Sequence, residues 1–231
     1  KAAASLTPRK LELPSGAAFR RCDDRRRMEV GGWLRPQMGL LGLDAVGVTG
    51  ADPFPEVRAE LERRRAEGLH GGMQFTFRNP ARSTDPGRIL EGARSLVVGA
   101  LRPPAPRLAE VGAGRLRIAA YARHDHYATL RGHLERLADR IRSDGWTARV
   151  VADDNALVDR AAAVRAGIGW YGKNANVLLP GRGSWFVLGA VVTDALLPPS
   201  EQVEEGCGTC RRCLDGCPTG AIIQPGVVDA R

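Results

Sequence analysis

The most constraining feature of this sequence is a run of four cysteines close to its carboxy-terminal end. Cys207, Cys210, Cys213 and Cys217 follow the spacing C-x2-C-x2-C-x3-C, and Pro218 comes directly after the last of them. In bacterial ferredoxins this spacing binds [4Fe–4S] clusters: the first three thiolates ligate one cluster, and the cysteine before proline ligates a second. The sequence therefore predicts three ligands for one cluster and one ligand for another.

Zinc and disulfides are the alternatives for these thiols. Zinc also binds four thiolates, but zinc sites usually pair two C-x2-C units across a longer spacer. Structural disulfides are disfavoured in a reducing cytosol. The fifth cysteine, Cys22, lies in a charged arm and is incidental to this prediction. Because each cluster needs four ligands, we expect either further cysteines beyond Arg231 or a chain that binds iron poorly.

Apolar runs and charge indicate where the protein acts and on what. The longest apolar run, residues 185–192, falls well short of the roughly 20 residues of a membrane helix. The pair Arg20-Arg21 is followed by charged residues rather than by the apolar stretch of an export signal. We therefore expect a cytoplasmic protein with no membrane partner. The net charge of +8 favours a polyanion such as nucleic acid, although the excess of arginine over lysine could equally reflect a coding bias.

The apolar pattern predicts an α+β fold. Strands are expected at residues 44–48, 96–100, 148–151, 176–179 and 184–192, and helices at 55–69 and 156–166, with a loop at 70–88. The clearest helix has Tyr127, Leu130, Leu134, Leu137 and Ile141 on one face, at intervals of three and four. We divide the chain into an irregular basic arm (1–35), a main domain (36–200) and the start of a cysteine-rich module (201–231).

A glycine motif, G-x-G-x-x-G at residues 167–172, matches the dinucleotide-binding pattern, which requires a strand before it and a helix after it. Here the order is reversed, so Gly167 is better interpreted as the C-terminal cap of the preceding helix. Gly169 would still let backbone approach a bulky group closely. Lys173, with Asn174 beside it, is the one lysine outside the first ten residues. A solvated surface lysine is the simpler interpretation, and a need for a compact point charge is the alternative.

Asp125 precedes the predicted amphipathic helix, and local sequence favours an N-cap whose carboxylate accepts backbone N–H bonds. The neighbouring residues His124, His126 and Tyr127 also have side chains of ionisable types. A carboxylic acid in a closed pocket can donate a proton, so a role as an acid stays open beside the cap. A metal site at the two histidines is disfavoured, because adjacent side chains diverge where a helix starts.

Several stretches between residues 40 and 231 resemble the epoxyqueuosine reductase family, the cobalamin-dependent iron–sulfur enzymes of tRNA queuosine synthesis. They are LGLDAVGVTGADPF, RSTDPGRILEGARSLVVGA, YARHDHYATLR, DDNALVDRAAAVRAGIGWYGKNANVLL, GSWFVLGAVVTD and CGTCRRCLDGCPTGAI. One departure is Asp125-His126-Tyr127, where the family usually has Asp-Tyr-His. The resemblance implies a nitroreductase-like cobalamin-binding domain followed by a ferredoxin-like module, incomplete here, which in the complete protein carries two [4Fe–4S] clusters.

The resemblance also implies a reaction and its residues. Electrons would pass from the clusters to cobalamin, which removes the epoxide oxygen of epoxyqueuosine at the wobble position of tRNA, with Asp125 as proton donor. The partners would be tRNA and an unidentified electron donor, and we expect a monomer. By motif position, the corrinoid candidates are Arg82, Asn155, Arg160, Gly169, Lys173 and Asn174.

Two other functions fit parts of the sequence. A reductive dehalogenase would share the corrinoid and iron–sulfur architecture, but the absence of an export signal and the positive charge argue against it. A simple ferredoxin-type electron carrier would need only the cysteine segment. It would leave about 200 upstream residues without a role, and it predicts that cobalamin does not bind.

Overall fold

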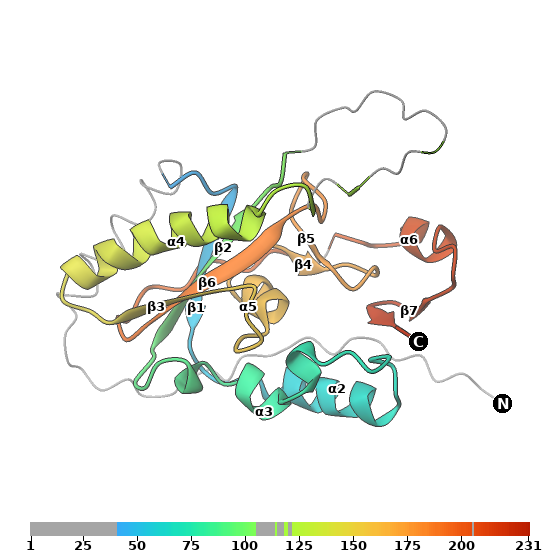
Figure 1. The fold of residues 1–231 in the computed structure, drawn as a ribbon, viewed down its shortest axis with the longest axis horizontal. Helices are drawn as coiled ribbons and strands as arrows, with labels where there is room; N and C mark the ends of the chain where they lie inside the picture. Colours follow the sequence, from blue (N-terminus) through green and yellow to red (C-terminus); the bar gives the residue numbers. More distant parts are fainter. Residues whose placement is uncertain (1–40, 105–113, 115–117, 120–121, 205) are drawn as a thin grey trace.

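The computed structural model describes residues 41–104, 114, 118–119, 122–204 and 206–231 (Figure 1). The predicted basic arm at 1–35, with Cys22, lies outside the described residues. The predicted boundary near residue 200 between a main domain and a cysteine module stays a prediction.

A four-stranded antiparallel sheet forms the centre of the described chain, with the strand order β1-β2-β6-β3. Its strands are β1 (Ala45–Gly50), β2 (Ser95–Leu101), β6 (Val187–Thr193) and β3 (Ala148–Ala152). The two inner strands, β2 and β6, are buried along almost their whole length. That burial explains why they stand in the sequence as continuous apolar runs rather than as alternating ones.

Both faces of the sheet are covered. On β2, Leu96 and Val98 belong to one hydrophobic cluster and Val97 to the other, as the two-residue period of a strand requires. The helix α4 (His126–Ser143) lies along the face that Val97 reaches. On the opposite face lies α5 (Asp159–Arg165), with α2 (Pro55–Ala66) and α3 (Pro80–Ser83) beyond it (Figure 1). The predicted mixture of helix and sheet is confirmed.

The amphipathic stripe of α4 is the best predicted core feature. Leu130, Leu134, Leu137 and Ile141 are all fully buried. The sheet makes room for the stripe with two glycines that are register partners, Gly99 on β2 and Gly189 on β6. A Cβ at Gly189 would lie 2.8 Å from Cδ1 of Leu134.

The glycine motif ends a helix, as predicted. Gly167 has φ +71°, and its N–H donates to the carbonyl of Val164. The N–H of Ile168 donates to the carbonyl of Ala163, which completes a Schellman motif after α5. A short strand, β4 (Trp170–Tyr171), follows instead of a helix and pairs with β5 (Val177–Leu178).

Some sequence expectations were wrong in extent. The segment 70–88, expected to be a loop, contains α3 and two 3-10 turns, η1 (Phe75–Phe77) and η2 (Pro86–Arg88). These elements of three or four residues are too short to show a helical period. The helix expected from residue 156 begins at Asp159, and the strand expected from residue 184 begins at Val187.

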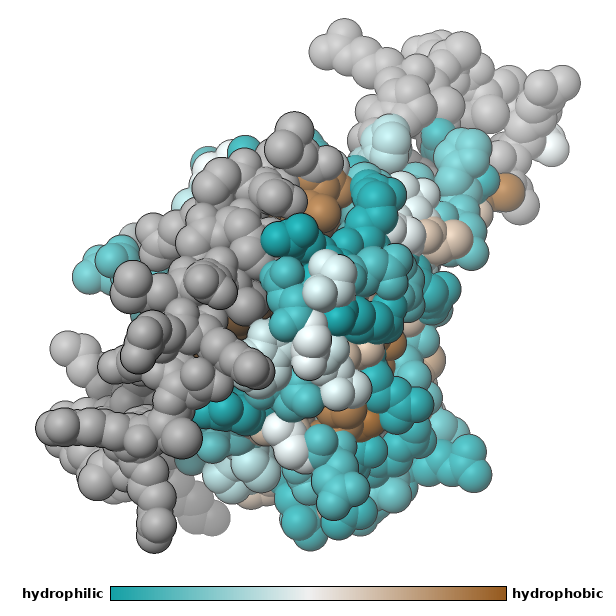
Figure 2. Space-filling view, turned by 90° about the vertical axis from the view of Figure 1, so that its left-hand side faces the viewer, coloured by the Kyte–Doolittle hydropathy of each residue, from teal (hydrophilic) through white to brown (hydrophobic). Residues whose placement is uncertain are grey.

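The carboxy-terminal segment contains α6 (Arg212–Asp215) and a hairpin of β7 (Ile222–Gln224) and β8 (Val227–Val228). Among the described residues, the helices are too short or too polar to cross a membrane. The part of the surface that is coloured in Figure 2 is largely hydrophilic, with small separate hydrophobic areas. The apolar side chains are instead concentrated in the two clusters beside the sheet.

Candidate functional site

The cysteine segment winds through tight turns. The N–H of Cys210 donates to the carbonyl of Cys207 at 2.9 Å, Cys213 lies on α6, and the N–H of Cys217 donates to the carbonyl of Leu214 at 3.3 Å. All four thiols are free, and each is at least partly exposed. Among the described residues, no three His, Cys, Asp or Glu side chains are gathered closely enough to hold a metal ion. The donor set itself, four thiols in eleven residues, suits iron bound by thiolates.

Hydrogen-bond donors surround two of the sulfurs. The N–H of Ile222 and the hydroxyl of Thr219 lower the pKa of Cys217. The indole N–H of Trp170 donates to Sγ of Cys207 at 3.4 Å. At Cys217 these donors favour the thiolate, which is the form that ligates metal. The surroundings of these thiols therefore fit a metal-binding role.

The hairpin of β4 and β5 holds the cysteine segment against the body of the protein. Nζ of Lys173 donates to the carbonyls of Gly208 at 2.7 Å and Cys210 at 3.0 Å. The backbone carbonyl of the same lysine accepts from the N–H of Gly226 at 3.0 Å. A compact ammonium fits between two carbonyls, which explains a lysine here in an arginine-rich chain. Lys173 is a corrinoid candidate by sequence, but in the structure its ammonium group contacts the backbone of the cysteine segment.

Replacing Lys173 by methionine is expected to loosen the cysteine segment while leaving the core intact. The change removes two charge-assisted hydrogen bonds to backbone carbonyls but keeps most of the apolar stem. Hydrogen–deuterium exchange of amides at residues 206–211 should accelerate several-fold, with exchange in β2 and β6 unchanged. Arg182→Met is the matched control, because Arg182 donates instead to the carbonyl of Asp44. Equal exchange in the two variants would contradict the docking role.

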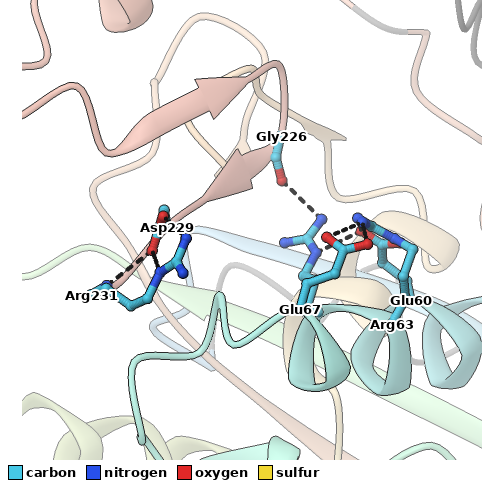
Figure 3. Close-up of polar contacts among 7 residues, drawn as sticks. Glu60, Arg63, Glu67, Gly226, Asp229 and Arg231 are labelled. Atoms are coloured by element: carbon cyan, nitrogen blue, oxygen red, sulfur yellow. Dashed lines mark hydrogen bonds and ion pairs between the residues drawn. The ribbon is translucent and has the colours of Figure 1, made fainter.

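The carboxy-terminal hairpin is attached on its other side to α2 (Figure 3). Nη2 of Arg64 donates to the carbonyl of Gly226 at 3.0 Å, while Nε of Arg64 is held by Glu60 at 2.6 Å. The N–H of Ala230 donates to the carbonyl of Leu69 at 2.9 Å. The carboxy-terminal hairpin, which follows the cysteine segment, is therefore attached both to α2 and, through Lys173, to the β4–β5 hairpin.

Asp125 occupies the N-cap of α4, as predicted. Its carboxylate accepts the N–H of Ala128 at 2.7 Å. The residue is exposed, whereas the neighbouring His126 is buried and its ring lies edge-on to that of His124, with 5.9 Å between centroids. The cap fixes the position of the carboxyl group and leaves the side chain accessible.

Two corrinoid candidates meet at one cavity. Arg82 and Asn155, 73 residues apart in sequence, line a cavity of about 470 Å³ together with Phe75, Arg78 and Asn79. The hydroxyl of Ser83 ties the two loops by donating to the carbonyl of Asn155 at 2.6 Å. The analysis of the sequence missed Phe75, Arg78 and Asn79. The signal that could have identified them was the presence of Phe75 and Arg78 in the segment 70–88, which was expected to be a loop.

The other corrinoid candidates shape the β4–β5 hairpin instead. Nη1 of Arg160 donates to the carbonyl of Ala175 at 2.8 Å, and Oδ1 of Asn174 accepts the N–H of Asn176. At Gly169, an added Cβ would lie 2.0 Å from the carbonyl oxygen of Leu178. None of these residues is among those that line the 470 Å³ cavity.

The sequence analysis also passed over Asp159, the first residue of α5. Burial raises the pKa of its carboxyl group, while the adjacent Arg160 acts in the opposite direction. The neighbouring carboxylate of Asp153 adds to the rise. No motif in the sequence distinguishes this aspartate from an ordinary helix-starting residue.

The fold and the site define a mixed helix-and-sheet protein with a thiol-rich segment docked on its body. Along most of its length, the chain is homologous to the epoxyqueuosine reductases. It is 32% identical over 198 residues to the epoxyqueuosine reductase of Bacillus anthracis, a match that covers 83% of this chain and 52% of that protein. No family model matches the chain.

Solved structures of epoxyqueuosine reductases share the fold. One, with an epoxyqueuosine-modified stem loop of tyrosine tRNA, has a TM-score of 0.75 and 30% identity over 85% of this chain and 54% of that one. Another, from Bacillus subtilis with its catalytic aspartate loop swung out of the active site, has a TM-score of 0.72 and 29% identity over 87% and 55%. The chain thus spans about half the length of these relatives.

Proposed function

We propose that this chain is the cofactor-binding part of an epoxyqueuosine reductase, an oxidoreductase that converts epoxyqueuosine to queuosine at the wobble position of tRNA. The observation that carries the proposal is the combination of homology along most of the chain with a ferredoxin-type cysteine segment docked on the folded body. When bound, [4Fe–4S] clusters and cobalamin would supply the electrons and the cobalt that remove the epoxide oxygen.

The cysteine segment would hold the clusters. By its spacing, Cys207, Cys210 and Cys213 would ligate one cluster and Cys217 a second. Lys173 and Trp170 would position the first of these turns through their bonds to Gly208, Cys210 and Cys207.

Cobalamin would lie against the loops that carry Arg82 and Asn155, because these two candidates share a cavity. Arg160, Gly169 and Asn174 stay candidates by motif position. In the structure they support the hairpin that carries Trp170 and Lys173, so their contribution would be to position it.

Asp125 would donate the proton to the departing epoxide oxygen. Its N-cap bond to Ala128 fixes the carboxyl group at the start of α4, and its exposure leaves the group accessible to a substrate. The Bacillus subtilis relative has a catalytic loop, named for an aspartate, that is swung out of its active site. A capping aspartate between a loop and a long helix suits such a role.

The substrate would be a tRNA with a queuosine-type anticodon, as the stem loop bound to the solved relative suggests. The net charge of +8 favours binding to a polyanion. The electron donor, a monomeric state and a cytoplasmic location stay expectations from the sequence.

The test uses a protein of the relatives' full length, reconstituted anaerobically with iron, sulfide and cobalamin, and given a reductant and tRNA that carries epoxyqueuosine. Mass analysis of the nucleosides should show the loss of one oxygen atom. Unchanged epoxide from a protein loaded with both cofactors would refute the proposal. Full cluster loading without cobalamin binding would instead favour a ferredoxin-type electron carrier.

A further inference from the structure

The cavity lined by Phe75, Arg78, Asn79, Arg82 and Asn155 combines positive charge, amide groups and an aromatic ring. Its volume of about 470 Å³ lies within the usual range for small-ligand sites. It is formed by η1, by the turn into α3 and by the loop after β3.

The two arginines of the cavity are available to a ligand. Within the described part of the chain, neither the Arg78 nor the Arg82 guanidinium takes part in an ion pair or a side-chain hydrogen bond. Four arginines nearby on α2 and η2 behave differently, since each of them is paired with a carboxylate, while Arg65 of α2 donates to the carbonyl of Phe77. These pairs are Arg58 with Glu62, Arg63 with Glu60 and Glu67, Arg64 with Glu60, and Arg88 with Asp85. Two uncompensated guanidiniums at one cavity favour an anion, and phosphate above all.

Phe75 is held in an unusual way beside these arginines. Its side chain is 60% exposed, and its φ of +29° lies in a region that non-glycine residues rarely adopt. Phe77, two residues on, instead packs near the His70 ring at 5.6 Å between centroids. Strained backbone that presents an aromatic ring to solvent is a reason to infer a binding function. A flat aromatic face is the platform on which nucleic-acid bases stack.

The frame around the cavity is fixed before any ligand arrives. The carbonyl of Ser83 accepts the N–H of Val158, and its hydroxyl donates to Asn155, so α3 and the loop after β3 are tied together. Oδ1 of Asn79 accepts the N–H of Arg82. That bond leaves the amide NH2 of Asn79 free to donate to a ligand. A preorganised frame lowers the entropic cost of binding.

We propose that this cavity binds one nucleotide unit, with the phosphodiester between Arg78 and Arg82 and the planar base against Phe75. The inference rests on the proposed function, which names the two ligands that could supply the nucleotide unit. These ligands are cobalamin and tRNA, and both contain such a unit. Cobalamin carries a phosphodiester and a base in its nucleotide tail, and tRNA carries them along its chain. The chemistry recognised is the same in either case.

The experiment compares Arg78→Gln and Phe75→Leu with wild type and with Arg88→Gln as a matched control. Arg88→Gln removes one positive charge, as Arg78→Gln does. Arg88 is paired with Asp85, however, and is not among the residues that line the cavity. Binding is measured for four probes: adenosine monophosphate, cobalamin, cobinamide, which lacks the nucleotide tail, and an RNA stem loop. Adenosine monophosphate and at least one of the larger ligands should bind about tenfold or more weakly to the two cavity variants, with the control unchanged.

The pattern of losses identifies the source. Weaker cobalamin binding with unchanged cobinamide binding assigns the site to the corrinoid tail. Weaker RNA binding with both corrinoids unchanged assigns it to tRNA. Equal losses for cobalamin and cobinamide, unchanged binding of every probe, or no binding of adenosine monophosphate to wild type would overturn the proposal. Failure of the epoxide assay alone, with these binding losses present, would count against the proposed function and not against the nucleotide site.

Discussion

Replacing Asp125 by asparagine is expected to lower epoxide reduction by about 10²–10⁴-fold, the range for the loss of a positioned general acid. The substitution is almost isosteric, and asparagine caps helices about as well as aspartate. The amide oxygen can still accept the N–H of Ala128, so α4 should begin at the same residue. The change therefore removes the transferable proton and little else.

The measurement is the rate at which epoxyqueuosine disappears from tRNA, with thermal unfolding and cobalamin binding recorded on the same samples. Both of these properties should match wild type. Asp125→Ala is the complementary variant, because it removes the cap as well and should cost about 1 kcal/mol of stability. Full activity of the asparagine variant would show that Asp125 is only a cap, as the local sequence alone favoured.

The sequence predicted those parts of the fold in which a local pattern carries the information. The period of Leu130, Leu134, Leu137 and Ile141 required one buried helix face, and the apolar runs of β2 and β6 required buried strands. Gly167 was identified as a cap because a helix came before it. These features depend on neighbours within a few residues, so they can be read without knowledge of the tertiary fold.

The arrangement of the candidate site could not be predicted in this way, since it depends on pairs far apart in the chain. Lys173 contacts Gly208 and Cys210, and Arg64 contacts Gly226 across 162 residues. The motif that marked Lys173 could not distinguish binding of a corrinoid from docking of the cysteine segment. Likewise, Arg78 became a candidate only when its guanidinium, which has no ion pair within the described residues, could be compared with the ion-paired arginines nearby.

Gly169→Ala is expected to destabilise the protein by about 3 kcal/mol, which corresponds to a fall in Tm of roughly 6–12 °C for a chain of this size. The added Cβ would lie 2.0 Å from the carbonyl oxygen of Leu178 and 2.9 Å from its carbonyl carbon. Both atoms are backbone of β5, so no side-chain rotation relieves the clash. The hairpin must move, and it carries the Trp170 and Lys173 contacts with the cysteine segment.

The measurement is thermal unfolding of the chain without cofactors, with Gly132→Ala as the opposite control. Gly132 lies on the exposed side of α4 with no atom within 4 Å of an added Cβ, so alanine there should stabilise by about 0.5–1 kcal/mol. If Gly169 served only to let a corrinoid approach, its alanine variant would unfold at the wild-type temperature and lose affinity for cobalamin alone. A large loss of stability in the absence of any cofactor would instead show that this glycine acts through the packing of the hairpin on which Trp170 and Lys173 lie.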